Sequence, residues 1–271
     1  MQNIKTKIII LFSLFLIQIL PANAITNGGP DGGAHPYVGL AVMDDVDGNP
    51  RWRCSGALIA PRLFLTAGHC TEAPAVRATI WFEEDVDAGI PDNGYPFAGP
   101  TSVDGTVYVH PQYNPVLFNH YDLGVIVLDT PVIMDRYGKL PELGMLDPLM
   151  TNRGNQDVTF TAVGYGLQKI NPVFIKGDRI RLQATLELVD LNGLGGVPAG
   201  SSIMLTSNVK TGGICFGDSG GPIFSMNTDI IIAVSSYAMN GNCAGVGGGY
   251  RVDTADDLDW LYSEFGYLMA E

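Results

Sequence analysis

The chain of 271 residues is short of positive charge. It carries 15 lysine and arginine residues against 28 aspartate and glutamate residues, so its formal net charge is −13 at pH 7. An acidic balance of this size argues against a nucleic acid or an anionic membrane surface as a partner. Beyond solubility, the charge itself indicates little.

Long apolar runs are also scarce. The clearest one spans residues 8–20, follows two lysines and ends just before the small residues of 21–24. A charged start, an apolar stretch shorter than the ~20 residues of a membrane span and a small-residue end are typical of a cleaved signal peptide. We predict that residues 1–24 are removed on export, which makes the protein secreted or periplasmic. An uncleaved anchor is the alternative.

Cysteine is rare and never occurs as Cys-x-x-Cys, a spacing typical of structural zinc sites. The four cysteines, Cys54, Cys70, Cys215 and Cys243, allow three pairings. An exported chain can form disulfides. We favour Cys54 with Cys70 and Cys215 with Cys243, because each pair flanks one of the candidate catalytic segments described below. A zinc site is the rival interpretation.

Apolar runs that alternate with helices, as in a βαβ protein, are absent. Short β-type runs alternate instead with Gly, Pro, Asn and Asp clusters, which predicts an all-β barrel or sandwich. The runs are 58–59, 62–66, 106–109, 123–128, 158–163, 180–188 and 230–235. The clearest helix is C-terminal. Its expected features are the N-cap Thr254, the first-turn acids Asp256 and Asp257, and a stripe of Leu258, Leu261, Tyr262 and Phe265.

A stretch rich in proline and glycine, residues 129–148, separates two β-rich halves of similar length. The chain after the signal is long enough for one large domain or two small ones with proper cores. We therefore divide it into an N-terminal domain, 25–138, and a C-terminal domain, 139–271.

One segment carries distinctive chemistry. Gly217-Asp218-Ser219-Gly220-Gly221-Pro222 places a serine hydroxyl on a glycine-rich turn beside a carboxylate. Serine is a weak nucleophile unless a base takes its proton and donors stabilise the oxyanion that forms. Flanking glycines leave the hydroxyl unshielded and let backbone N–H groups converge on one point. A simple strand-connecting turn is the alternative, since Gly and Asp favour turns.

A base is sought among only four histidines, because imidazole titrates near neutrality. His69 follows an apolar strand that ends in small residues, which leave room around the ring. His35 and His110 each precede a proline, which favours a surface turn. His120 lies two residues before Asp122 and is harder to dismiss.

Asp122 opens the apolar run 122–128. A carboxylate buried there needs a donor such as an imidazole N–H. A strand-start aspartate that faces water is the alternative.

Together, the segments 65–70, 122–128 and 217–222 resemble the motifs of chymotrypsin-like (trypsin-type, S1) serine proteases, in that family's order His, Asp, Ser. The resemblance covers essentially all of 25–271, most weakly at 83–105 and 165–210. It implies an all-β fold of two six-stranded antiparallel barrels with the active site between them. It also implies a monomeric secreted endopeptidase that cleaves polypeptides through an acyl-enzyme.

The resemblance assigns roles to single residues. Ser219 is expected to attack the peptide carbonyl, His69 to act as base and then as acid, and Asp122 to orient His69. The backbone N–H groups of Gly217 and Ser219 are expected to bind the oxyanion.

The resemblance also extends to activation. Ile25-Thr26-Asn27-Gly28 is similar to the family's mature N-terminus, whose ammonium pairs with the aspartate before the nucleophile, here Asp218. Signal removal after Ala24 would free the Ile25 ammonium in one cut. A cut elsewhere, with a separate zymogen, is the alternative.

Specificity in this family depends on a pocket whose floor lies six residues before the nucleophile, which here is Gly213. Because no carboxylate stands there, cleavage after Arg or Lys is not expected. Ser236, Tyr237, Ala238 and Gly248 are the expected walls, and they indicate an uncharged slot for apolar side chains. A register slip of one residue would put Tyr237 in the narrow wall position and shrink the slot.

No cofactor or metal is expected, with one alternative. Glu83, Glu84 and Asp85 lie where some relatives bind calcium, although a solvated acidic loop is the simpler interpretation. A catalytically inactive homologue that acts as a binding module is the main rival function.

Overall fold

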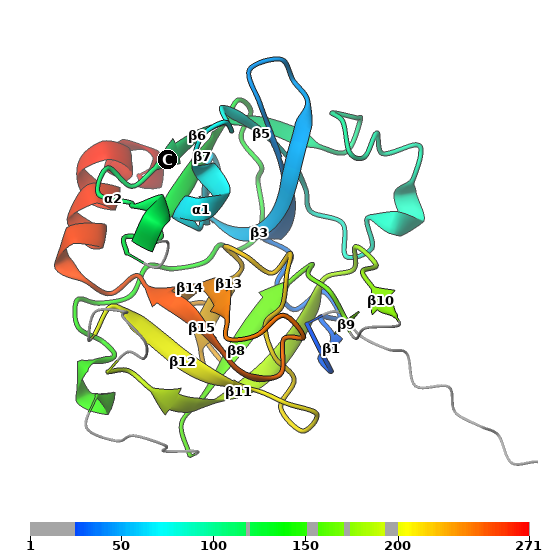
Figure 1. Cartoon of the computed structure of the whole chain (residues 1–271). Coiled ribbons are helices and arrows are strands. Elements are labelled where there is room, and N and C mark those ends of the chain that lie inside the picture. The colour runs from blue at the N-terminus through cyan, green and yellow to red at the C-terminus, as the bar shows by residue number, and fades with distance from the viewer. Residues whose placement is uncertain (1–24, 118–119, 151–156, 171–173, 193–199, 271) are drawn as a thin grey trace, which may run out of the picture.

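Two antiparallel β-barrels, one above the other in Figure 1, make up the chain. The computed structural model describes residues 25–117, 120–150, 157–170, 174–192 and 200–270. The predicted signal peptide lies outside the described residues. None of the helices within these ranges is both long and apolar enough to cross a bilayer.

The first barrel closes in the order β2-β3-β4-β7-β6-β5. Its strands are β2 (Val38–Asp44), β3 (Pro50–Ala60), β4 (Leu63–Thr66), β5 (Arg77–Trp81), β6 (Val103–Val109) and β7 (Gly124–Leu128). Short helical segments in and after it are α1 (Gly68–Thr71), η1 (Asp87–Gly89), η2 (Pro115–Leu117) and η3 (Asp147–Leu149).

The second barrel has the order β11-β12-β15-β14-β13-β8 and closes where β8 pairs with β11. Its strands are β8 (Thr159–Gly164), β11 (Leu182–Asp190), β12 (Ser202–Ser207), β13 (Pro222–Ser225), β14 (Ile231–Ala238) and β15 (Gly245–Arg251). β1 (Gly29–Pro30) adds to β11, and β9 (Lys169–Ile170) pairs with β10 (Ile175–Lys176). The predicted two-barrel fold is confirmed.

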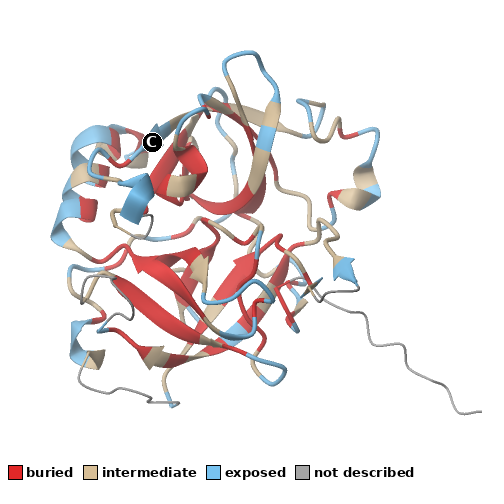
Figure 2. Cartoon of the chain, in the orientation of Figure 1, coloured by how far each residue is buried: buried red, intermediate tan, exposed pale blue. Residues whose placement is uncertain are grey.

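Side-chain alternation explains why these segments form barrels. In β11, Leu182, Ala184, Leu186 and Leu188 are buried while the residues between them are partly or fully exposed. A period of two places every second side chain on the inner face. The short strand β4 is buried along its whole length, in keeping with its apolar sequence. Figure 2 shows the resulting buried interior of each barrel.

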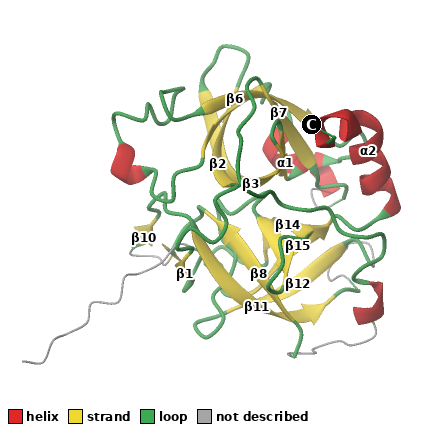
Figure 3. Ribbon diagram, turned by 180° about the vertical axis from the view of Figure 1, so that it is seen from behind, coloured by secondary structure: helices red, strands yellow, loops and turns green. Residues whose placement is uncertain are grey.

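The C-terminal helix α2 (Ala255–Met269) packs beside the first barrel although it follows the second in the sequence, as Figures 1 and 3 both show. Leu261, Phe265 and Leu268 join the first barrel's apolar core. The prediction that Tyr262 shares this face is wrong, because Tyr262 is 56% exposed. One step of 100° beyond Leu261 turns its ring toward solvent.

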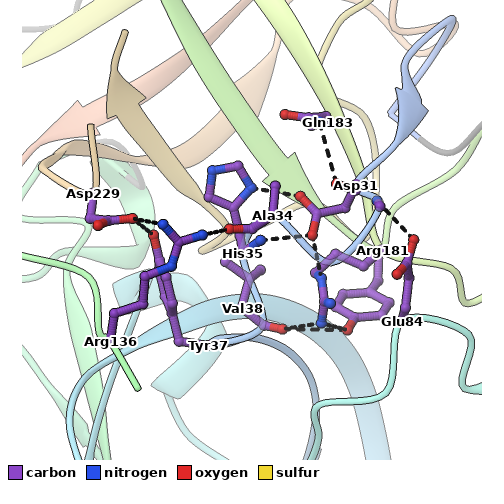
Figure 4. Close-up of polar contacts among 12 residues, drawn as sticks. Asp31, Ala34, His35, Tyr37, Val38, Glu84, Arg136, Arg181, Gln183 and Asp229 are labelled. Atoms are coloured by element: carbon purple, nitrogen blue, oxygen red, sulfur yellow. Dashed lines mark hydrogen bonds and ion pairs between the residues drawn. The ribbon is translucent and has the colours of Figure 1, made fainter. Parts of the chain in front are cut away.

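A buried ionic cluster holds the N-terminal segment against both barrels (Figure 4). The Arg181 side chain donates to the Asp31 carboxylate at 3.0 Å and to the carbonyl oxygens of Val38 and Phe82 at 3.2 and 2.9 Å. Because β1 directly precedes Asp31 and pairs with β11, the residues after Ile25 are held beside the second barrel.

The backbone changes its hydrogen-bond partner between residues 138 and 139. The Gly138 N–H donates to the Leu58 carbonyl in the first barrel, and the Lys139 N–H donates to the Asp229 carbonyl in the second. The chain therefore passes from one barrel to the other at this point.

Candidate active site

Pairing of β4 with β7 brings His69 and Asp122 together. His69 lies on α1, directly after β4, and Asp122 lies two residues before β7, whose Gly124 pairs with Thr66. The His69 Nδ1 atom is 2.9 and 3.0 Å from the two carboxylate oxygens of Asp122. The His69 backbone N–H also donates to this carboxylate, at 2.8 Å.

The Asp122 carboxylate is fully buried and receives a further donor from the second barrel. The Ser236 hydroxyl, on β14, donates to it at 2.5 Å. This contact was not predicted, since Ser236 was expected only as a pocket wall. Burial by itself lowers the pKa of His69, but the charge and hydrogen bond of Asp122 outweigh it and hold that pKa above 6.5.

The loop that carries Ser219 is held by β3. The Ser55 N–H donates to the Ser219 carbonyl at 2.7 Å, and the Ser55 hydroxyl donates to the Gly217 carbonyl at 2.9 Å. Gly220 has a φ of 76°, and a Cβ there would lie 2.0 Å from the Thr66 hydroxyl. Glycine is therefore required at this close approach of the two barrels.

Ser219 and His69 line one cavity of about 320 Å³. Three of the expected pocket residues, Ser236, Tyr237 and Ala238, line it as well. The other lining residues are Ile214, Cys215, Phe216 and Ser235. Sequence reasoning missed these four, although three of them stand between Gly213 and Gly217 and so adjoin the expected floor.

Two expected pocket residues do not line this cavity. Gly213 is pressed against Ser207, whose hydroxyl would lie 1.8 Å from a Cβ at position 213. A Cβ on Gly248 would meet the Tyr237 ring at 2.2 Å, so Gly248 adjoins Tyr237 and not the cavity. The neighbouring Gly247 faces Ile214, since a Cβ there would lie 2.6 Å from Ile214 Cγ1.

Asp218 is buried and does not line the cavity. Its carboxylate accepts the N–H groups of Gly166 and Cys215 at 2.8 and 2.9 Å. Burial raises the pKa of Asp218 to about 7, against the opposing effect of these N–H groups and of the positive charge of Arg53. Ile25 is fully buried in the core of the second barrel. Within the described part of the chain, no recorded contact joins Ile25 to Asp218.

Both expected disulfides are present. Cys54 is bonded to Cys70 and Cys215 to Cys243. Among the described residues, the one grouping of potential metal ligands is Cys54, His69 and Cys70, and its two sulfur atoms form a disulfide. The zinc interpretation is therefore wrong for these cysteines.

Two carboxylates of the acidic loop bind backbone N–H groups, one of a distant segment and one of the loop itself. The Glu84 carboxylate accepts the Gly32 N–H, and the Asp85 carboxylate accepts the Ala88 N–H, both at 2.9 Å.

The expectation of a surface position for His110 is wrong. The residue is 1% exposed, and its ring stacks on Tyr121 and meets the edge of Trp260. Its Nε2 lies 3.9 Å from the carboxylate of Asp257. Burial raises the pKa of that carboxyl to about 7. His35 is half-buried and binds Asp31. Both histidines do begin turns, since the N–H groups of Val38 and Tyr113 donate to their carbonyl oxygens, but a turn does not by itself expose the side chain.

Comparison with known proteins defines the class. A family model described as Trypsin matches residues 30–261, so the chain belongs to the trypsin family. Phenoloxidase-activating factor 3 of Holotrichia diomphalia is 26% identical over 260 residues, which cover 86% of this chain and 70% of that protein. Brachyurin of Leptuca pugilator is 27% identical over 238 residues, 85% of this chain and 93% of that protein.

Some relatives are longer. The chain spans 64% of serine protease 7 of Drosophila melanogaster, at 26% identity over 261 residues and 89% of this chain. Among solved structures, one titled HL collagenase has a TM-score of 0.69 at 22% identity and covers 89% of this chain and 98% of its own. A scabies mite inactivated protease paralogue has a TM-score of 0.64 at 15% identity and covers 90% and 98%. These two likenesses show the fold.

Proposed function

We propose that the protein is a secreted serine endopeptidase in which Ser219, His69 and Asp122 form the catalytic triad. The observation that supports this best is the hydrogen bond between His69 Nδ1 and the buried Asp122 carboxylate. His69 also lines the same cavity as Ser219. Because Asp122 accepts a hydrogen bond from the Nδ1–H group of His69, Nε2 is left unprotonated and free to take a proton.

The proposed reaction has two stages, acylation of Ser219 and hydrolysis of the acyl-enzyme. Ser219 Oγ bonds to the peptide carbonyl carbon while its proton moves to His69 Nε2. The tetrahedral oxyanion accepts hydrogen bonds from the N–H groups of Gly217 and Ser219. In related sites each such donor stabilises the transition state by roughly 3 kcal/mol. The C–N bond then breaks as His69 protonates the leaving amine. Water then attacks the acyl carbon while His69 takes its proton, and the ester bond to Ser219 Oγ breaks as His69 returns that proton to Oγ.

Activation is proposed to follow signal removal. A cut after Ala24 would free the Ile25 ammonium, whose pairing with Asp218 would satisfy a carboxylate that is otherwise costly to bury. N-terminal sequencing of the active protein should give Ile25 as the first residue. Any other terminus on fully active protein would refute this route.

The side chain before the scissile bond is proposed to be uncharged and apolar. Ile214, Phe216 and Ala238 support this, since they give the cavity apolar walls and none of its lining residues carries a carboxylate. Digestion of a peptide library should show cleavage after aliphatic or aromatic residues. Dominant cleavage after Arg or Lys would overturn the assignment.

Labelling with a fluorophosphonate tests the enzyme against an inactive binding homologue. The mature protein should be labelled once, and Ser219→Ala should abolish the label. Ser263→Ala is the matched control, because Ser263 is exposed on α2 and should leave labelling unchanged. A well-folded wild-type protein that resists the reagent would favour the inactive homologue.

A further inference from the structure

Arg53 lies beside the loop that carries Ser219. Arg53 and Ser55 are two positions apart on β3, so their side chains share one face of the strand. Ser55 binds the backbone of Ser219 and Gly217. Arg53 Nε lies 3.4 Å from the point where a Cβ on Gly217 would stand, and its Nη1 reaches the Gly177 carbonyl at 3.5 Å.

Arg53 lacks the carboxylate partner that its neighbours have. Arg51 pairs with Asp45 at 3.6 Å, and Arg179 pairs with Asp87 at 2.7 Å. Among the described residues, no carboxylate forms an ion pair with Arg53. The nearby Asp218 is turned toward backbone N–H groups. In a chain of net charge −13, this leaves a local positive charge at the edge of the active site.

The Cys54–Cys70 disulfide ties the strand that carries Arg53 to the segment that carries His69. Cys70 follows His69, which protonates the leaving amine, and Cys54 follows Arg53. Because the Cα atoms of the bonded cysteines are 6.2 Å apart, Arg53 is held close to the residue that protonates the leaving amine. Extended chain advances about 3.3–3.6 Å per residue, so this separation corresponds to about two residues of the leaving segment.

A second, smaller cavity adjoins Arg53. It measures about 190 Å³ and is lined by Arg51, Trp52, Arg53, Tyr95 and Pro96, among others. Arg179 covers the Tyr95 ring, with its guanidinium carbon 4.6 Å from the ring centre. Two arginines and two aromatic rings thus line a space of side-chain size, and a third arginine covers one of these rings.

We propose that Arg53 binds a carboxylate side chain of the polypeptide substrate, at the first or second residue after the scissile bond. This assignment rests on the proposed endopeptidase function. A guanidinium presents two parallel N–H donors that match a carboxylate, which a lysine cannot reproduce. The preferred substrate therefore combines an apolar residue before the bond with Asp or Glu just after it.

Matched peptides test this assignment. Pairs that differ only by Glu or Gln at these two positions are compared by kcat/KM with the mature enzyme. They are also compared by fluorescence anisotropy binding to Ser219→Ala, which needs no catalysis. A charge-assisted, half-buried contact should favour Glu about tenfold, and the preference should shrink as salt is raised.

Variants then locate the effect. Arg53→Gln should abolish the Glu preference, Arg53→Lys should keep part of it, and Arg53→Glu should favour Lys at the same position. Arg77→Gln is the control, since Arg77 lies on β5, pairs with Asp129 and should keep the wild-type ratio. An unchanged ratio in Arg53→Gln, or equal binding of both peptides to Ser219→Ala, would overturn the proposal. Peptide binding with the Glu preference but without cleavage would refute only the endopeptidase.

Discussion

Replacing Asp122 by asparagine should disable the proposed enzyme without unfolding it. The amide can still face His69 and Ser236, but its NH₂ group donates where the carboxylate accepted. His69 Nδ1 must then accept, so the proton moves to Nε2, which can no longer take one from Ser219. The variant should therefore fold normally and hold the wrong imidazole tautomer.

The size of the loss follows from the distance between the two groups. At 2.9 Å and an effective dielectric constant of about 20, an imidazolium and a carboxylate attract by about 6 kcal/mol. Losing this attraction in the transition state corresponds to about 10⁴-fold in kcat/KM. The same aspartate-to-asparagine change in a serine-protease triad lowers kcat by a similar factor.

The assay is kcat/KM for an apolar peptide across pH, with thermal melting to check folding. The wild-type acid limb should lie above pH 6.5, because Asp122 raises the pKa of His69 and the base is lost below that pKa. Ser236→Ala, which keeps the carboxylate but removes one donor, should lose only about tenfold. A folded Asp122→Asn variant within tenfold of wild-type activity would refute the reasoning.

Three further outcomes are expected. Replacing both Cys54 and Cys70 by alanine should lower the free energy of unfolding by about 3 kcal/mol in urea denaturation, because the bond closes a 16-residue loop; an unchanged midpoint would contradict this. Gly247→Ala should push Ile214 into the cavity. For peptides with a large apolar residue before the scissile bond, kcat/KM should then fall at least tenfold more than for peptides with alanine there. Equal losses for the two kinds of peptide would count against this pocket. Because burial raises the pKa of Asp257 to about 7, its ionisation costs stability as pH rises from about 4 through 7, so Asp257→Asn should narrow the difference in melting temperature between pH 5 and 8.

The fold could be predicted from the sequence because the strongest signals for strands are local. Apolar runs bounded by Gly, Pro, Asn and Asp mark strands without knowledge of their partners. Which face of a helix is buried depends on the surface it meets, and this is why Tyr262 was assigned wrongly. The prediction that His110 lies at the surface was wrong for a related reason, since the ring of Trp260, 150 residues away, packs against it.

That His69 binds Asp122 and shares a cavity with Ser219 could be predicted, since each of the three residues stands in its own short motif. The walls of the cavity could not, because they depend on pairing between distant strands. Tyr237 pairs with Gly248 across a register shift in β14, and this shift decides that Gly247, not Gly248, faces Ile214. The support from Ser236 was missed for the same reason, since it crosses between the barrels.

The two barrels hold each other's proposed catalytic groups. Ser236 of the second barrel donates to Asp122 of the first, while Ser55 of the first donates to the backbone of Ser219 in the second. A small rotation between the barrels would break both contacts together and separate His69 from Ser219. The precision of the site therefore depends on the interface as much as on either barrel. Partial unfolding at this interface should abolish activity while most of the β-structure remains.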